Sequence, residues 1–294
     1  MAESEIHAIR TLLTSKPRPV GWAARRQRIE KVGAVWPAAA DVKLTAVGLG
    51  GIPGEWSIAP GSDAARVLIY FHGGGYCSGS IVSHRRLVTE AGRAAAARTL
   101  AIEYRLAPEH PFPAAFDDAL AAWRFLRAQG VAAKNIAVGG DSAGGGLSIA
   151  LTNRLCTDGE EQPACVWLIS PWTDLTMSGS TMVSKDAVDP MIRKAYLEEL
   201  AGSYVPAGMD RKDPRVSPLF ADLTGFPPML VQVGSDETLL DDAVRFAAAA
   251  GAAEVAVTLE IWPHMIHAWP VWNARLESGR RALAKAGAFM RQHF

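Results

Sequence analysis

The sequence has few cysteines, no net charge and no long apolar segment, and each absence excludes a class of protein. Its 294 residues include only three cysteines, at an odd count and without metal-site spacing: Cys77, Cys156 and Cys165. We therefore expect free, mostly buried thiols in a reducing compartment. Lys and Arg number 30, as do Asp and Glu, which argues against a nucleic-acid partner, since phosphate contacts need an excess of positive charge. No stretch reaches ~18 uninterrupted apolar residues, and the first residues lack the apolar run of a signal peptide. These observations predict a cytoplasmic protein without a membrane span.

Short β-rich runs alternate with longer amphipathic runs along most of the chain. The runs typical of strands lie at 67–71, 99–104, 135–138, 166–169, 229–233 and 255–262. The runs typical of helices lie at 116–126, 145–156 and 273–292, and the alanine runs at 94–97 and 247–250 also fit helical patterns. This alternation predicts an α/β fold, with a mostly parallel sheet covered by helices on both faces. In such sheets, ligands bind at the carboxyl ends of the strands.

Two segments interrupt the alternation. Residues 1–40 carry a helical pattern before the first predicted strand, and residues 178–210 form a helical insertion between two strands. We interpret both as parts of a helical cap over a catalytic domain that spans 41–294. The alternative is that both segments are peripheral decoration.

A candidate nucleophile stands between a predicted strand and a predicted helix. Gly140-Asp141-Ser142-Ala143-Gly144 matches the pattern G-x-S-x-G, in which a sharp turn exposes the serine hydroxyl and the glycines avoid collisions. The alternative is a phosphate-binding loop, but this segment lacks the Gly-Lys-Ser/Thr that such a loop requires. The pattern therefore favours Ser142 as a nucleophile.

A second glycine-rich segment, His72-Gly73-Gly74-Gly75, directly follows the run at 67–71. We expect its backbone N–H groups, with that of Ala143, to form an oxyanion hole, and His72 to anchor the loop by hydrogen bonding. The alternative for the glycines is a simple tight turn.

A nucleophilic serine needs a base, and the base needs an acid that orients it. Asp236 follows the run at 229–233, and His267 follows the run at 255–262. We favour these two over the competing acid Asp174 and the competing base His264. The remaining histidines are expected to be solvated surface residues: His7, His84, His110 and His293.

At this point the motifs resemble those of a known family. The glycine segment at 72–75, the block at 103–114 that reads EYRLAPEHPFPA, and the GDSAGG block at 140–145 strongly resemble the bacterial hormone-sensitive-lipase-like carboxylesterases of the α/β-hydrolase fold. The blocks at 170–175 and 213–219 are similar to further blocks of that family, so the likeness runs from about residue 65 to 270.

The resemblance implies a catalytic triad of Ser142, Asp236 and His267. It places Gly73, Gly74 and Ala143 at the oxyanion positions, and it implies an N-terminal cap and often a homodimer. The sequence departs from the family at Asp236-Glu237-Thr238 and at His267-Ala268-Trp269, where the family commonly has Asp-Pro-Leu and His-Gly-Phe. The second departure changes the bulk beside the base.

The predicted activity is hydrolysis of short- to medium-chain acyl esters through an acyl-enzyme. This chemistry requires no metal or organic cofactor, and the string at 48–53, GLGGIP, lacks the following helix that dinucleotide binding needs. Trp22, Trp172, Trp269 and Met209 are candidates for lining the acyl pocket. The open alternatives are an amidase or natural-product deacetylase of the same fold, and a non-catalytic receptor on the hydrolase scaffold.

Overall fold

A computed structural model describes residues 2–294 and contains one twisted sheet of eight strands. The strands are β1 (Lys43–Leu49), β2 (Ile52–Ile58), β3 (Asp63–Phe71), β4 (Ala97–Ile102), β5 (Ile136–Asp141), β6 (Cys165–Ile169), β7 (Met229–Gly234) and β8 (Val257–Trp262). They lie in the order β1-β2-β4-β3-β5-β6-β7-β8. Strands β3 to β8 pair in parallel, while β1 and β2 pair antiparallel at one edge.

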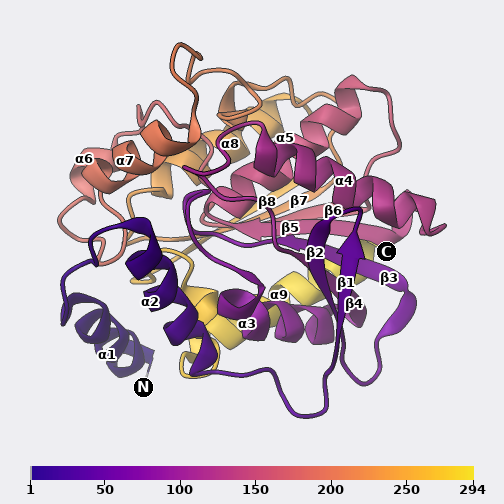
Figure 1. Cartoon of the computed structure of the whole chain (residues 1–294), viewed down its shortest axis with the longest axis horizontal. Coiled ribbons are helices and arrows are strands. Elements are labelled where there is room, and N and C mark those ends of the chain that lie inside the picture. The colour runs from indigo at the N-terminus through magenta and orange to yellow at the C-terminus, as the bar shows by residue number, and fades with distance from the viewer. Residues whose placement is uncertain (1) are drawn as a thin grey trace.

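Helices cover both faces of this sheet. The helices are α1 (Ala2–Thr14), α2 (Trp22–Ala34), α3 (Ile81–Ala95), α4 (Ala114–Ala128), α5 (Ala143–Thr157), α6 (Thr181–Ser184), α7 (Lys194–Tyr204), α8 (Leu240–Ala252) and α9 (Glu277–His293). Short 3-10 helices lie at Ala133–Asn135, Pro218–Phe220 and Trp269–Trp272. In Figure 1, α3 and α9 lie below the sheet, and α4, α5 and α8 lie above it. The predicted α/β fold with a mostly parallel, doubly covered sheet is confirmed.

The predicted strands all form, with ends within a few residues of those expected. Every residue of β5, β6 and β7 is buried, because these strands are covered by helices on both sides and their side chains have no solvent face. Their continuous apolar runs are what made them visible in the sequence.

The β1–β2 hairpin was not predicted from the sequence. Its tight turn is formed by Gly50 and Gly51, with φ of 66° and 104°, and two successive positive φ values are what a two-residue hairpin turn requires. The glycine string at 48–53 is therefore a hairpin signal. Strand β1 is mostly exposed and lacks a continuous apolar run, so hydrophobic periodicity did not reveal it.

The alanine run at 94–97 is only partly helical. Helix α3 ends at Ala95, Ala96 caps it with φ of 50°, and Ala97 begins β4. The prediction that the whole run is helical is wrong, because tertiary pairing with β3 overrides the helix preference of alanine.

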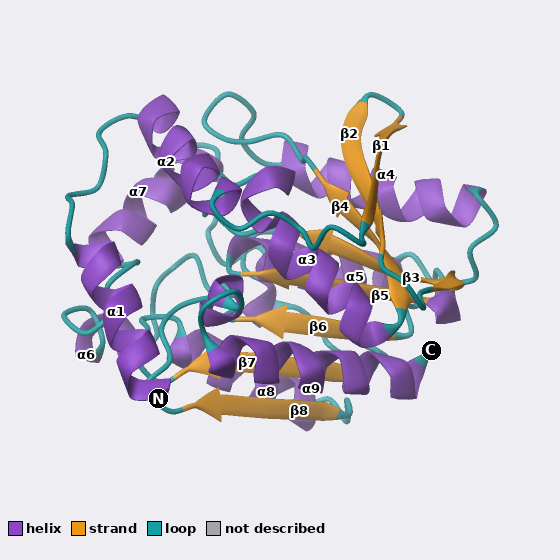
Figure 2. Ribbon diagram, turned by 90° about the horizontal axis from the view of Figure 1, so that it is seen from below, coloured by secondary structure: helices purple, strands orange, loops and turns teal. Residues whose placement is uncertain are grey.

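Residues 2–40 and the insertion at 178–210 gather on one side of the molecule. Figure 2 shows α1, α6 and α7 at the end of the sheet to which the arrows of β5–β8 point. Arg25 of α2 forms an ion pair with Glu199 of α7 at 2.8 Å, and the Arg18 guanidinium lies 3.3 Å from the ring centre of Tyr196. Two segments far apart in sequence therefore form one layer over the carboxyl ends of the strands.

Two further features concern the described residues as a whole. None of the helices within residues 2–294 has the length and apolar character needed to cross a bilayer.

All three cysteines are free, and burial raises the pKa of Cys77 and of Cys165 to about 12. These two thiols are therefore protonated at neutral pH and are poor nucleophiles.

Candidate active site

Ser142 stands on a sharp turn between β5 and α5. Its φ of 54° and ψ of −121° lie in a strained region, which persists only where the surroundings fix it. The Ser142 N–H donates to the carbonyl of Ile169 at 2.9 Å, and its own carbonyl accepts from Trp172 N–H at 2.9 Å. A Cβ at Gly140 or Gly144 would collide with backbone atoms. The geometry of a nucleophile elbow is thus built from backbone contacts.

The loop that follows β3 turns tightly beside Ser142. Gly74 and Gly75 have φ of 120° and 64°. A Cβ at Gly74 would strike the Ser78 carbonyl, and a Cβ at Gly75 would lie 2.5 Å from Leu200 Cδ1 of α7. Both positions therefore require glycine, for backbone conformation and for space.

Gly73 has a different role from the one expected. Its N–H donates to Asp141 Oδ1 at 2.9 Å, so this donor is already used and does not face a substrate. The hydrogen bond ties the glycine loop to the residue that precedes Ser142. The structure therefore does not match the expectation that Gly73 supplies an oxyanion donor.

His72 anchors the loop, as expected. Its Nδ1 hydrogen-bonds to the Gly73 carbonyl at 2.9 Å, and Tyr104 Oη donates to the His72 carbonyl at 2.7 Å. Burial lowers the pKa of His72 to about 3, helped by the neighbouring His84. The imidazole of His72 is therefore neutral, in a structural position.

His84 is not the solvated residue that we expected. It is buried on α3, and its Nε2 lies 3.3 Å from Asp141 Oδ2. Burial works to lower the pKa of His84, but the charge and hydrogen bond of Asp141 outweigh it and raise the pKa. Asp141 also accepts from Tyr70 Oη at 2.8 Å. The expectation was wrong because His84 lies on the inner face of α3 and pairs with the buried Asp141. Hydrophobic periodicity cannot predict such a pair.

The carboxylate that meets His267 belongs to Glu237. His267 Nδ1 lies 3.2 Å from Glu237 Oε1, and both side chains are buried. Glu237 Oε2 accepts from Ser170 Oγ at 2.8 Å and from the Gly234 N–H at 2.9 Å. Ser170 Oγ in turn accepts from Ala268 N–H at 3.1 Å, so the loops after β6, β7 and β8 are joined around this carboxylate.

Asp236, the expected acid, turns the other way. Its Oδ2 accepts from Arg10 Nη2 at 2.6 Å, and its Oδ1 lies 3.8 Å from Lys185 Nζ. Asp236 and Glu237 lie in the turn after β7, where the Asp236 carboxylate contacts Arg10 and the Glu237 carboxylate contacts His267. This corrects the expected contact between Asp236 and His267.

The environment of His267 favours its charged form. Burial works to lower the pKa of His267, but the hydrogen bond and charge of Glu237, with the charges of Asp189 and Asp141, outweigh burial and raise it. A raised pKa makes the neutral imidazole of His267 a stronger base. His264, the competing base, is exposed.

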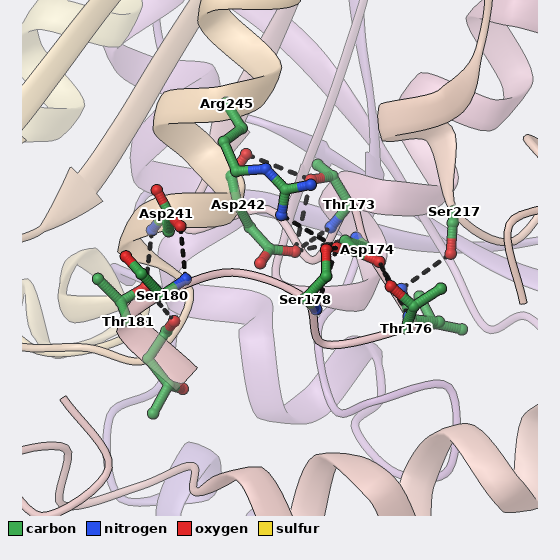
Figure 3. Close-up of polar contacts among 12 residues, drawn as sticks. Thr173, Asp174, Thr176, Ser178, Ser180, Thr181, Ser217, Asp241, Asp242 and Arg245 are labelled. Carbon is green, nitrogen blue, oxygen red and sulfur yellow. Dashed lines mark hydrogen bonds and ion pairs between the residues drawn. The ribbon is translucent and has the colours of Figure 1, made fainter. Parts of the chain in front are cut away.

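Asp174, the competing acid, is committed elsewhere. Figure 3 shows it among Thr176, Ser178 and Arg245, and its Oδ2 accepts from Arg245 Nη1 at 3.0 Å. In the same view, Asp242 of α8 points toward Thr173 and accepts from the backbone N–H groups of residues 173 and 174 at 2.9 Å each. Burial raises the pKa of Asp242 to about 8. This cluster holds the start of the insertion to α8.

The four expected lining residues divide into two pairs. Trp172 and Trp269 are fully buried, whereas Trp22 and Met209 are partly buried against the core.

Three residues of the site were not predicted from the sequence: Glu237, Ser170 and Asp189. The two acidic residues at 236–237 were a signal, but nothing in the sequence indicated which one faces inward.

Comparison with known proteins identifies the family of this chain. Residues 68–271 match a family model described as the alpha/beta hydrolase fold. The chain is 39% identical over 298 residues to an acetyl-hydrolase of Streptomyces hygroscopicus, covering 99% of this chain and 97% of that protein. It is 34% identical over 266 residues to an esterase of Acinetobacter venetianus, covering 90% and 88%. This chain belongs to the alpha/beta hydrolase family.

Solved structures that are similar to this chain include esterases. A crystal structure of an esterase from the bacterial hormone-sensitive lipase family superposes with a TM-score of 0.95 at 40% identity, covering 99% of this chain and 97% of that one. The expected family, fold and class of enzyme are confirmed: this alpha/beta hydrolase is a carboxylic ester hydrolase. Within residues 2–294, no cluster of three or more His, Cys, Asp or Glu side chains is arranged to hold a metal ion.

Proposed function

We propose that this hydrolase cleaves esters of short- to medium-chain acids with Ser142 as nucleophile, His267 as base and Glu237 as acid. The observation that carries the proposal is the buried contact between His267 Nδ1 and Glu237 Oε1. Asp141, the residue before the strained Ser142, also acts electrostatically on His267. A carboxylate at Nδ1 holds the imidazole in the tautomer whose Nε2 accepts a proton. Glu237 thereby takes the role that the sequence suggested for Asp236.

In the proposed reaction, Ser142 Oγ attacks the ester carbonyl carbon while His267 Nε2 takes the hydroxyl proton. The carbonyl π electrons move onto oxygen and form the oxyanion. When the carbonyl re-forms, the bond to the alkoxy oxygen breaks, and the alcohol leaves with the proton from His267. Water then attacks the acyl-enzyme by the same sequence, releasing the carboxylic acid and restoring Ser142.

We assign the oxyanion donors to the backbone N–H groups of Gly74, Gly75 and Ala143. Gly73 is excluded because its N–H already donates to Asp141. Ala143 opens α5, where the helix dipole also favours negative charge. One preorganised donor of this kind is worth about 3–4 kcal/mol in the transition state.

Side chains of the insertion pack against the glycine loop and the residue that follows it. Leu200 of α7 abuts Gly75, and the rings of Tyr76 and Tyr204 stack with their centres 3.8 Å apart. We propose that residues 1–40 and 178–210 form a cap whose side chains restrict the acyl group. The name acetyl-hydrolase given to the Streptomyces relative supports a small acyl group.

A series of p-nitrophenyl esters tests the proposed substrate range. We expect the highest kcat/KM between C4 and C8 and a steep fall at longer chains, and matched acetyl anilides should react more slowly than the esters. A maximum at C16 would contradict the proposed acyl limit. Faster anilide cleavage would instead indicate an amidase.

Labelling with a fluorophosphonate tests the nucleophile. The wild-type protein should take up one label, and Ser142→Ala should take up none while keeping its circular dichroism spectrum and Tm. Labelling that persists in Ser142→Ala would contradict the assignment. An unlabelled, inactive wild type would support the receptor alternative.

The expected homodimer and cytoplasmic location stay predictions. Light scattering on the purified protein would give its mass relative to the 31.4 kDa of one chain. Cell fractionation would test the location.

A further inference from the structure

Asp189 is a buried carboxylate of the insertion that lies close to the proposed acid and base. It is fully buried. Its Oδ1 accepts from the N–H groups of Met191 and Ile192 at 2.8 and 2.9 Å. Its Oδ2 accepts from Thr238 N–H at 3.0 Å and lies 3.5 Å from Thr238 Oγ1. Thr238 directly follows Glu237, so this carboxylate joins the insertion to the loop that carries the proposed acid.

Burial raises the pKa of Asp189, while the charge of His267 and the backbone hydrogen bonds oppose that rise. Every hydrogen-bond partner of Asp189 is an N–H or O–H donor, which favours the ionised carboxylate. Within the described part of the chain, no lysine or arginine forms an ion pair with it. A buried charge without such a partner is costly, and the group that responds to it is His267, on which Asp189 acts electrostatically.

Arg10 makes a second, outer connection between the same two segments. Its Nη1 donates to the Val188 carbonyl at 3.1 Å, and its Nη2 donates to Asp236 Oδ2. The residues before Asp189 and before Glu237 are therefore bridged by one guanidinium. This outer bridge is partly exposed, whereas the contact between Asp189 and Thr238 is buried.

We propose that Asp189 is a positioning residue of this hydrolase: it holds the Glu237 loop through Thr238 and adds a second negative charge that stabilises the imidazolium of His267. The inference rests on the proposed triad. It makes the insertion part of the proton-transfer machinery as well as a wall over the substrate. Loss of the charge should weaken the base, and loss of the hydrogen bonds should loosen the acid.

Three carboxylates act on the imidazole of His267. Glu237 faces it from the loop after β7, Asp141 from the end of β5, and Asp189 from the insertion. Asp141 is itself paired with His84 of α3. Only Asp189 can be neutralised without touching the proposed triad or the oxyanion loop.

The test is the pH dependence of kcat/KM for p-nitrophenyl acetate in Asp189→Asn. Asparagine keeps the shape and one acceptor oxygen but removes the charge. A neutral neighbour lowers the pKa of an imidazole, so the acid limb should move to lower pH by roughly 0.5–1 unit. At the optimum, kcat should fall by roughly three- to tenfold, since less charge stabilises the imidazolium.

Asp174→Asn is the matched control. Asp174 is also buried, ionised and hydrogen-bonded near the start of the insertion, but its partners lie away from the Glu237 loop. It should leave the acid limb in place even where it lowers Tm. If Asp189→Asn does not fold, Asp189→Ser, which keeps one hydroxyl acceptor, is measured in the same way.

The outcomes separate the two levels of the proposal. A folded, neutral variant at 189 with an unmoved acid limb would overturn the inference and leave the triad standing. An equal shift in Asp174→Asn would also overturn it, by making the effect one of general structure. A wild type that does not hydrolyse the ester would overturn the proposed function and this inference together.

Discussion

The serine turn and the acid loop are held in different ways. The turn at Ser142 is fixed by backbone contacts and by glycines that leave no room for a side chain. The loop at 236–238 is fixed by side chains from distant parts of the chain, among them Arg10, Ser170 and Asp189. The serine turn can therefore be recognised from a local sequence motif. The arrangement of the loop at 236–238 depends on contacts that form only when the chain folds.

The largest test of this comparison is Glu237→Gln against Asp236→Asn. Glutamine can keep a contact with His267 Nδ1 but loses the charge that stabilises the imidazolium, so kcat should fall by roughly 10³–10⁴-fold. Asp236→Asn removes only partners on the outer side and should lower kcat by less than about threefold. Steady-state kinetics on p-nitrophenyl butyrate would measure both.

The reverse ranking of these two variants would restore Asp236 as the acid. Comparable losses in both would mean that the loop acts as one unit and that the charges cannot be assigned separately. Tm values for both proteins would identify any loss of activity that is due to unfolding.

A second prediction concerns pH and the cluster that holds the insertion to α8. The pKa of Asp242 is raised to about 8 from an unfolded value near 3.8, so the folded protein keeps a proton that the unfolded chain releases. This contribution to stability is fully present below pH 3.8 and is lost as the pH rises to about 8. Asp242→Asn should remove this slope, which amounts to several kcal/mol because each pKa unit is worth about 1.4 kcal/mol.

Urea unfolding at pH 5, 7 and 9 would measure the effect. Asparagine keeps the acceptor for the N–H groups of residues 173 and 174, so the variant should gain stability relative to wild type as the pH rises. An unchanged pH slope would contradict the raised pKa of Asp242.

A third prediction tests the serine turn. Gly140→Ala places a methyl group against backbone atoms of Phe71 and Gly144, which cannot move aside. The free energy of unfolding should fall by about 2–3 kcal/mol. The matched control is Gly202→Ala on α7, where a Cβ meets nothing within 4 Å, and there alanine should be neutral or slightly stabilising.

The smallest expected effect is that of Arg10→Met. The ion pair with Asp236 is partly exposed, with side-chain exposures of 24% and 20%, so its loss should cost about 1 kcal/mol or less. We expect kcat/KM to fall by up to about fivefold, and Tm to change little. A loss comparable to that of Glu237→Gln would mean that the outer bridge, and not Asp189, fixes the acid loop.

The sequence predicted the parts of the molecule that depend on local rules. The sheet was predictable because buried parallel strands are continuous apolar runs, and Ser142 because its turn demands glycines at fixed positions. The sequence did not predict which of Asp236 and Glu237 contacts His267. Asp236 instead pairs with Arg10, which is more than two hundred residues away in the sequence. The partner of His84 and the use of Gly73 N–H were hidden for the same reason, since both depend on Asp141.

The N-terminal helix α1 supplies distant contacts to the region around His267. Ile6 and Ile9 of α1 are buried in the same cluster as Met265 and Ile266, next to His267, and Arg10 follows them on the same helix. A chain shortened to begin after Thr14 would retain every strand, the serine turn and both glycine motifs. It would nevertheless expose apolar surface beside the base and release Asp236. Such a trimmed protein should fold and take up a phosphonate slowly, behaving as an enzyme with its parts present but poorly aligned.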